Sequence, residues 1–242
     1  MAANPILNEK AFERAQMRVS AQNAMTLQGT INKTFFLLLL CVAGGMITWT
    51  NYQSWLGITW IVSIVAFILA IVMTFKPALS PMLSPLYAFG QGMFLGAVSA
   101  AYNVQFKGIV FQAVAITVLV FFVMLFLYKT RIIRVTRGLA IGIVSATGAV
   151  ALFYIGSLLL GLFGVNTSYL SSSSPLSIGI SLVVCGIAAF NFLLDFNMID
   201  QMTGEYTAPK YMEWYAAFGL VLTLIWLYIE VLRLLSKFQS RN

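Results

Sequence analysis

Seven apolar runs divide the chain, and each approaches the roughly 20 residues that a helix needs to cross the hydrocarbon of a bilayer. None shows the alternation of polar and apolar residues that is typical of barrel strands, whereas a spanning helix satisfies its own backbone hydrogen bonds. The pattern therefore predicts an all-α, polytopic membrane protein folded as a compact bundle of seven transmembrane helices. The runs cover residues 34–52, 55–75, 81–102, 108–128, 138–163, 177–199 and 214–235.

The links between these runs are short, which predicts one transmembrane domain over residues 34–242. Residues 1–33 are polar and predict an N-terminal arm outside the hydrocarbon. Two pairs of glycines spaced by four residues, Gly92 with Gly96 and Gly138 with Gly142, predict close packing of the third and fifth runs against neighbouring helices.

Composition confirms that the solvent of this chain is lipid. Of 242 residues, 60% are hydrophobic and only 9% are charged, fewer charges than a soluble surface needs. The chain has no histidine, which excludes a Ser-His catalytic site and a zinc site with histidine ligands. Cys41 and Cys185 both lie in apolar runs, so we expect free, buried thiols. We expect no enzymatic activity, no cofactor and no nucleic-acid partner.

The distribution of basic residues predicts the orientation of the chain. With seven spans and a cytoplasmic N-terminus, most lysines and arginines fall inside, including the four in the link 129–137. The basic C-terminus disagrees with this orientation. If the last run re-entered the membrane instead of crossing it, that disagreement would vanish, but we predict seven spans.

Asp195 lies within the sixth apolar run. A carboxylate in hydrocarbon is costly unless it faces a cavity, a partner or an ion, so it is a candidate functional residue. Asn191 precedes it by four residues and lies on the same helical stripe, which must face protein or water. The alternative is that Asp195 pairs with a neighbouring amide or cation and only fixes the packing.

Further acidic residues follow Asp195 toward the predicted cytoplasmic mouth. Asp200, Glu205 and Glu213 lie close together in the sequence, and Lys76 and Lys210 are the candidate counter-charges. Grouped carboxylates attract hard cations such as Ca²⁺, so we expect an ion-binding mouth there. A solvated acidic loop is the alternative interpretation.

Glu230 is the second carboxylate within an apolar run, and Arg233 follows it by three residues. This spacing predicts a local ion pair on one helix face. A gate residue at the far side of the membrane is the alternative role for Glu230 and Arg233.

Several segments in this order resemble the Bax inhibitor-1 family, the transmembrane Bax inhibitor motif proteins with YccA-like bacterial members. The resemblance covers nearly the whole chain and includes the basic fourth link. It depends on Asn191-Phe-Leu-Leu-Asp195-Phe-Asn-Met-Ile-Asp200 and on Glu213-Trp-Tyr-Ala-Ala-Phe-Gly, and on the closing Trp226-Leu-Tyr-Ile-Glu230-Val-Leu-Arg233-Leu-Leu. The opening Asn4-Pro5-Ile-Leu-Asn8-Glu9 is similar to a bacterial subgroup, which implies a bacterial inner membrane.

The resemblance implies a helical bundle with the last helix at its centre. It also implies a pH-sensitive Ca²⁺ leak controlled by two aspartates, one on each of the last two helices. Asp195 matches the first aspartate, but the second position falls at about Thr223, which cannot ionise. Either Glu213 or Asp200 replaces the second acid, or this chain lacks the two-acid sensor. Lys76 matches, by location only, the basic residue that latches the buried aspartate.

We therefore expect a cation leak, with Ca²⁺ as the transported or bound ion and Asp195 as its gate. The alternative is a regulatory membrane protein that binds another membrane protein, such as a protease, through the N-terminal arm. An intramembrane protease is disfavoured because the chain has no Gly-x-Gly-Asp segment.

Overall fold

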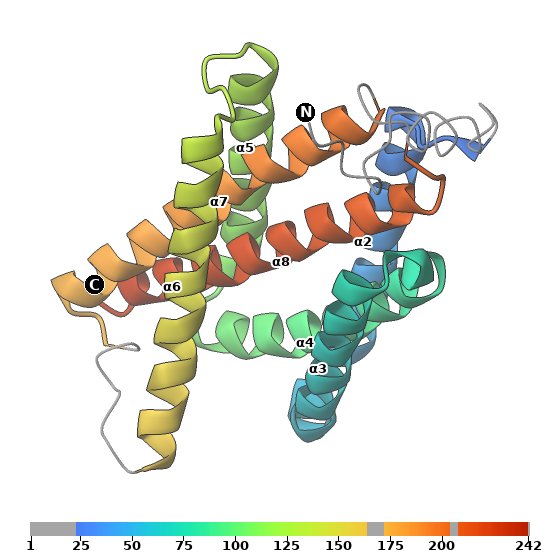
Figure 1. Cartoon of the computed structure of the whole chain (residues 1–242). Helices are drawn as coiled ribbons and strands as arrows, with labels where there is room; N and C mark the ends of the chain where they lie inside the picture. The colour runs from blue at the N-terminus through green and yellow to red at the C-terminus, as the bar shows by residue number, and fades with distance from the viewer. Residues whose placement is uncertain (1–22, 164–171, 204–207, 242) are drawn as a thin grey trace.

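The structure, a computed structural model, describes residues 23–163, 172–203 and 208–241. Within these residues the chain forms seven long α-helices and one short 3-10 helix, η2 (Figure 1). In order they are α2 (Leu27–Trp49), α3 (Tyr52–Phe75), η2 (Pro77–Leu79), α4 (Ser80–Gln105), α5 (Ile109–Lys129), α6 (Arg137–Leu162), α7 (Pro175–Thr203) and α8 (Met212–Gln239).

Each of the seven predicted runs lies within a long helix or overlaps most of it. Six of these helices are long and apolar enough to cross a membrane. The seventh, α4, has 26 residues, about 39 Å at the usual helical rise, but it carries more small and polar residues. The prediction of an all-α, polytopic membrane protein is confirmed.

Local sequence sets the helix boundaries. Thr26 caps α2 by accepting a hydrogen bond from the backbone N–H of Gly29 at 3.0 Å, so α2 begins before the apolar run itself. Thr136 caps α6 in the same way. Proline occupies the first turn of α4, and Gly108 adopts a positive φ of 82° between α4 and α5, a conformation that glycine tolerates without strain.

The last helix is the centre of the bundle. In the most apolar part of α8, 56% of the residues are buried, against 17–33% in the corresponding parts of the other five spans. Helices α2, α4, α5 and α7 all pack on it. It is one continuous helix of 28 residues, about 42 Å long, so the last run does not turn back as the re-entrant alternative requires.

The contact between α2 and α4 is the most extensive between any two described helices, and glycines let the two backbones approach closely there. A side chain added at Gly92 would lie 2.0 Å from the carbonyl oxygen of Cys41, and one at Gly96 would lie 2.3 Å from that of Gly45. This confirms the packing role predicted for Gly92 and Gly96. The same prediction is wrong for Gly138 and Gly142 in α6, because a side chain added at either position would meet open space.

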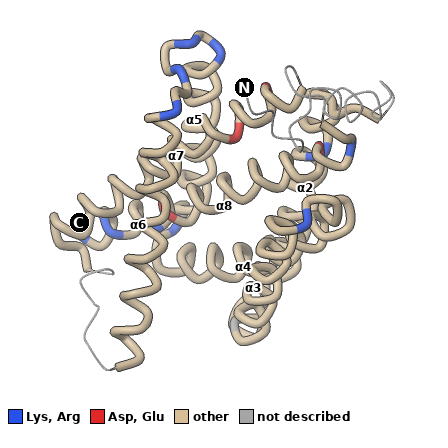
Figure 2. The backbone as a smooth tube through the Cα atoms, viewed as in Figure 1, with Lys and Arg blue, Asp and Glu red and all other residues tan. Residues whose placement is uncertain are grey.

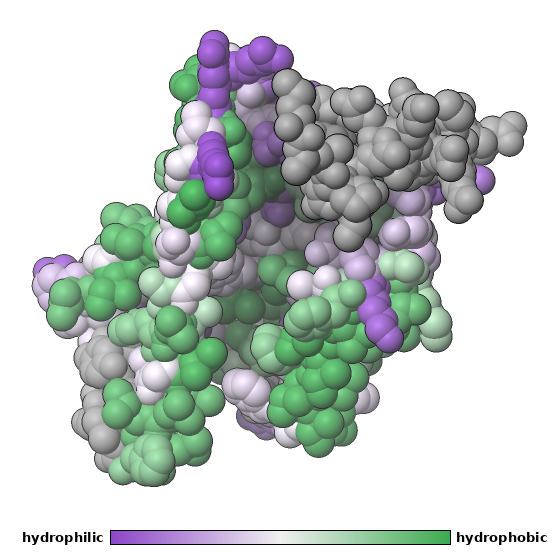
Figure 3. Space-filling model, viewed as in Figure 1, coloured by the Kyte–Doolittle hydropathy of each residue, from purple (hydrophilic) through white to green (hydrophobic). Residues whose placement is uncertain are grey.

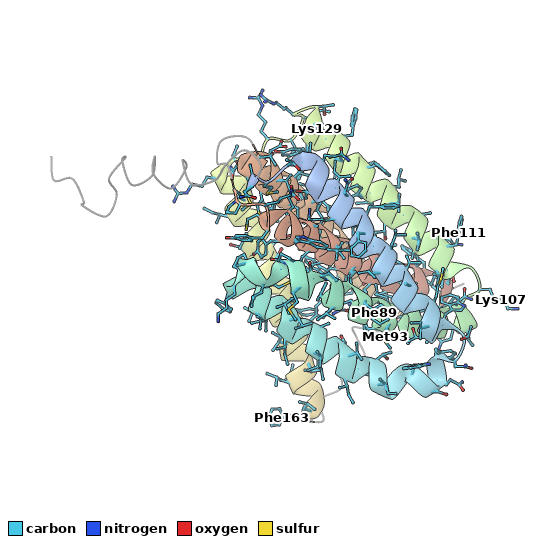
Figure 4. The ribbon with its side chains drawn as sticks, turned by 90° about the vertical axis from the view of Figure 1, so that its right-hand side faces the viewer. Phe89, Met93, Lys107, Phe111, Lys129 and Phe163 are labelled. Carbon is cyan, nitrogen blue, oxygen red and sulfur yellow. The ribbon has the colours of Figure 1, made fainter. Side chains whose placement is uncertain are left out.

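The outer surface fits a lipid environment. Figure 3 shows hydrophobic residues over α3 and over α6, and a strongly hydrophilic tip at the turn between α5 and α6. Figure 4 shows Lys107, just before α5, and Lys129, its last residue, at the two ends of that helix. We call the two ends of the bundle the Glu213 end and the Glu230 end, after the glutamates near the two ends of α8.

Candidate functional site

Asp195 lies on α7 where that helix packs against α8. Its Oδ2 accepts a hydrogen bond from the Thr223 hydroxyl at 2.7 Å. A side chain added at Gly219, one turn earlier on α8, would lie 3.6 Å from Oδ1. The two carboxylate oxygens therefore face α8, one toward a hydroxyl donor and the other toward bare backbone.

No basic side chain in the described part of the chain pairs with Asp195. The ion pairs found there join Lys33 to Glu213 and Arg233 to Glu230. The expected latch between Asp195 and Lys76 is therefore not formed. Lys76 follows the last residue of α3 and its side chain is exposed. Because α3 packs mainly on α4, the lysine is not directed toward α7.

Asn191 shares the predicted stripe with Asp195 but contacts a different helix. Its Nδ2 donates to the Thr147 hydroxyl of α6 at 2.9 Å and to the Ile187 carbonyl of its own helix at 2.8 Å. Ser181 and Ala188, which helical spacing places on the same stripe, are buried. The stripe faces protein, as predicted, and it joins α7 to both α6 and α8.

The predicted acidic mouth is divided between separate partners. Tyr128 of α5 donates its hydroxyl to Asp200 at 2.8 Å, and this contact lies beside the basic turn between α5 and α6 that Figure 2 shows as a cluster of blue. Glu205 lies outside the described residues. Among those that are described, no three acidic, cysteine or histidine side chains come together as a metal site would require.

Glu213 has a dense set of donors at the start of α8. Its Oε1 accepts from both the backbone N–H and the hydroxyl of Thr26, each at 2.9 Å, and its Oε2 pairs with Lys33. The Lys33 ammonium also lies 5.4 Å from the ring centre of Trp214, a favourable cation–π geometry. Glu213 therefore joins α8 to α2. It does not reach Asp195, so it does not replace the second acid, as one of the sequence alternatives proposed.

The local pair between Glu230 and Arg233 is confirmed, with Nη1 3.2 Å from each carboxylate oxygen. Tyr154 of α6 also donates to this carboxylate, at 3.0 Å. A second cation lies one turn further along α8. Lys237 is only 4% exposed as a residue, and its ammonium donates to the Ser181 hydroxyl at 2.7 Å and to the Ser177 carbonyl at 3.3 Å.

Sequence reasoning missed Lys237 although a signal was present. Residues 230, 233 and 237 are spaced by three and four positions, which places them on one face of a helix. No spacing in the sequence indicates the contact of Tyr154, because this residue lies on another helix, 76 residues before Glu230.

A family model described as Bax inhibitor 1 like matches residues 4–240. The chain belongs to this family. No curated protein matches it. Membership in the Bax inhibitor 1-like family, together with the spans described above, makes the chain a multi-pass membrane protein. The position at which the family resemblance implies a second acid, Thr223, is the residue that donates to Asp195.

Proposed function

We propose that this protein is a pH-sensitive cation leak of the Bax inhibitor-1 type, with Asp195 as the gating residue and Ca²⁺ as the expected ion. One observation carries the proposal. Asp195 lies between the central helix and α7 with a single hydroxyl donor and no paired cation among the described residues.

This geometry links the charge of Asp195 to the contact between α7 and α8. An ionised carboxylate at hydrocarbon depth is costly when one neutral hydroxyl is its only compensation. Protonation removes that cost, so it changes the relative free energies of the packed arrangement and of any arrangement that admits water to Asp195. Coupling to one proton allows a change of at most about tenfold in the open population per pH unit.

Thr223 takes the place of a second acid in this proposal. A hydroxyl can donate to the ionised carboxylate and can accept from the protonated one. The pair therefore needs only one titrating group, and we expect the flux to change with pH in one step. Thr223→Asp would create two coupled acids, and the pH dependence should then divide into two steps.

The test is ion flux into vesicles that contain the purified full-length protein, measured for Ca²⁺, Na⁺ and K⁺ across a range of pH. Wild-type flux should change with pH. Asp195→Asn mimics the neutral acid, so its flux should be independent of pH and equal to the wild-type value at the acid limit. Asp200→Asn is the matched control, since Asp200 lies on the same helix but is exposed, and it should retain the wild-type profile.

Two outcomes would refute this function. If Asp195→Asn kept the wild-type pH profile, the gate would lie elsewhere. If wild-type vesicles carried no cation above the level of empty vesicles, a regulatory role through binding of another membrane protein would replace the leak. That role predicts loss of partner capture when residues 1–20 are deleted, whereas a leak should survive the deletion.

We further propose that the protein resides in a bacterial inner membrane with its N-terminus in the cytoplasm. The four basic residues between α5 and α6 support this orientation, because basic links favour the cytoplasmic side. Labelling of single cysteines introduced at exposed Lys107 and Lys129 in intact cells tests it, since an impermeant reagent should react only at position 107.

A further inference from the structure

A cavity of about 260 Å³, lined in part by charged and hydroxyl-bearing side chains, lies at the Glu230 end of the bundle between α4, α6, α7 and α8. It is distinct from the contact between Asp195 and Thr223. Its lining combines two cations with hydroxyl groups, from Tyr102, Tyr154, Ser181, Ser236, Arg233 and Lys237.

The side-chain charges around this cavity do not balance. Glu230 is the one acidic side chain that pairs here in the described structure, and both of its oxygens are engaged by Arg233 and Tyr154. Lys237 is left with two neutral acceptors, a hydroxyl and a backbone carbonyl. The link between α6 and α7, residues 163–174, contains no charged residue in the sequence, so it supplies no second carboxylate. Counted over the residues that the structure describes, the cluster carries one positive charge in excess.

Such an arrangement is costly unless an anion completes it. A buried ammonium without a counter-ion loses far more solvation than two neutral hydrogen bonds restore. Donors are also left over. An ammonium has three N–H groups and a guanidinium has five. Toward the described residues, Lys237 uses two of its N–H groups and Arg233 donates through Nη1 alone.

We infer that this cavity binds a phosphate-type anion, the chemistry shared by the phosphodiester of a phospholipid headgroup and by free phosphate. An arginine fork and a lysine point charge are the two side chains that proteins use most for phosphate oxygens. The cavity lies at the last turns of α8 and the first turns of α7, the depth at which a spanning helix meets lipid headgroups. The bound anion would neutralise the excess charge of Lys237.

The experiment measures thermal unfolding of the full-length protein after exchange into a neutral, phosphate-free detergent. The separate additions are short-chain phosphatidylglycerol, inorganic phosphate and short-chain diacylglycerol. A ligand that binds the folded protein raises Tm with its concentration, and the titration gives an apparent Kd. Phosphatidylglycerol should stabilise the protein and diacylglycerol should not. If inorganic phosphate alone gives the same shift, the site is one for the free anion.

Two variants remove the excess charge in opposite ways. Lys237→Met deletes the cation, and Ser181→Asp supplies a carboxylate in place of the hydroxyl that lies 2.7 Å from the ammonium. Each should weaken the phosphate-dependent shift by about tenfold or more in Kd, the effect of losing one charge-assisted hydrogen bond. Lys107 is exposed and precedes the start of α5, which contacts the end of α8 through Gln112 and Gln239. Lys107→Met should leave the Kd unchanged.

The inference is overturned if neither phosphate-containing addition raises Tm. It is also overturned if Lys237→Met and Ser181→Asp both retain the wild-type Kd, or if diacylglycerol stabilises as strongly as phosphatidylglycerol. None of these measurements depends on ion flux, so the anion site and the proposed leak can fail separately.

Discussion

Glu213 and Glu230 lie near the two ends of α8 and are almost equally buried, at 1% and 2% exposure, but their surroundings differ. Glu213 has one cation, Lys33, and two donors from Thr26. Glu230 has one paired cation, Arg233, and a second cation, Lys237, lies one turn beyond Arg233. The ionic contact of Glu213 is balanced as it stands, whereas that of Glu230 has a surplus cation beside a cavity.

This difference separates a structural ion pair from a binding site. At Glu213 the hydrogen-bond donors and the cation match the carboxylate, so the ion pair joins two helices and leaves no group free to bind a ligand. Where a buried cation has only neutral partners, the protein alone does not satisfy it. Removing the lysine at each end should therefore change the free energy of unfolding in opposite directions and by different amounts.

The largest effect is expected for Lys33→Met at the Glu213 end. It leaves the Glu213 carboxylate buried without its cation, a change that costs about 3 kcal/mol in other proteins. Lys33 is 19% exposed, so solvent reduces part of the loss. The free energy of unfolding in a denaturant titration measures it, with exposed Lys210→Met as the control. Adding Glu213→Gln to the variant should recover most of the stability, and a failure to recover would show that the pair contributes little.

A smaller loss is expected for Gly29→Ala. The new methyl group would lie 2.2–2.4 Å from the Glu213 carboxylate, and the carboxylate cannot move away without leaving Thr26 and Lys33. Crowding of this kind costs about 2 kcal/mol. Gly186→Ala is the matched control on α7, because an added side chain there meets open space. Equal stability of the two variants would mean that Glu213 is held more loosely than its contacts indicate.

The comparison also shows which contacts a sequence can reveal. Seven apolar runs predicted the seven helices because lipid imposes one length and one composition on a spanning segment. Glu230 and Arg233 were paired correctly because their contact is set by helical spacing alone. The central position of α8 came with the family resemblance, and its burial confirms that position.

Contacts between helices were not predictable in the same way, because they depend on how each helix is rotated about its axis. Asp200 and Glu213 are close in the sequence, yet Asp200 accepts a hydrogen bond from Tyr128 of α5, whereas Glu213 accepts one from Thr26 at the start of α2. The expected mouth of grouped acids is therefore divided. In the sequence Thr223 stands only where an acid is expected, and nothing there reveals that its hydroxyl reaches Asp195.

The smallest expected effect has the opposite sign and lies at the Glu230 end. In detergent free of phosphate and phospholipid, Lys237→Met should raise the free energy of unfolding by about 1 kcal/mol, because it replaces a buried ammonium without a counter-ion by an apolar side chain of similar length. The same denaturant titration measures it beside Lys33→Met. A loss comparable to that of Lys33→Met would mean that the bonds of Lys237 to Ser181 and Ser177 already satisfy it. The two ends of α8 would then be equivalent, and the cavity would have no surplus charge for an anion to neutralise.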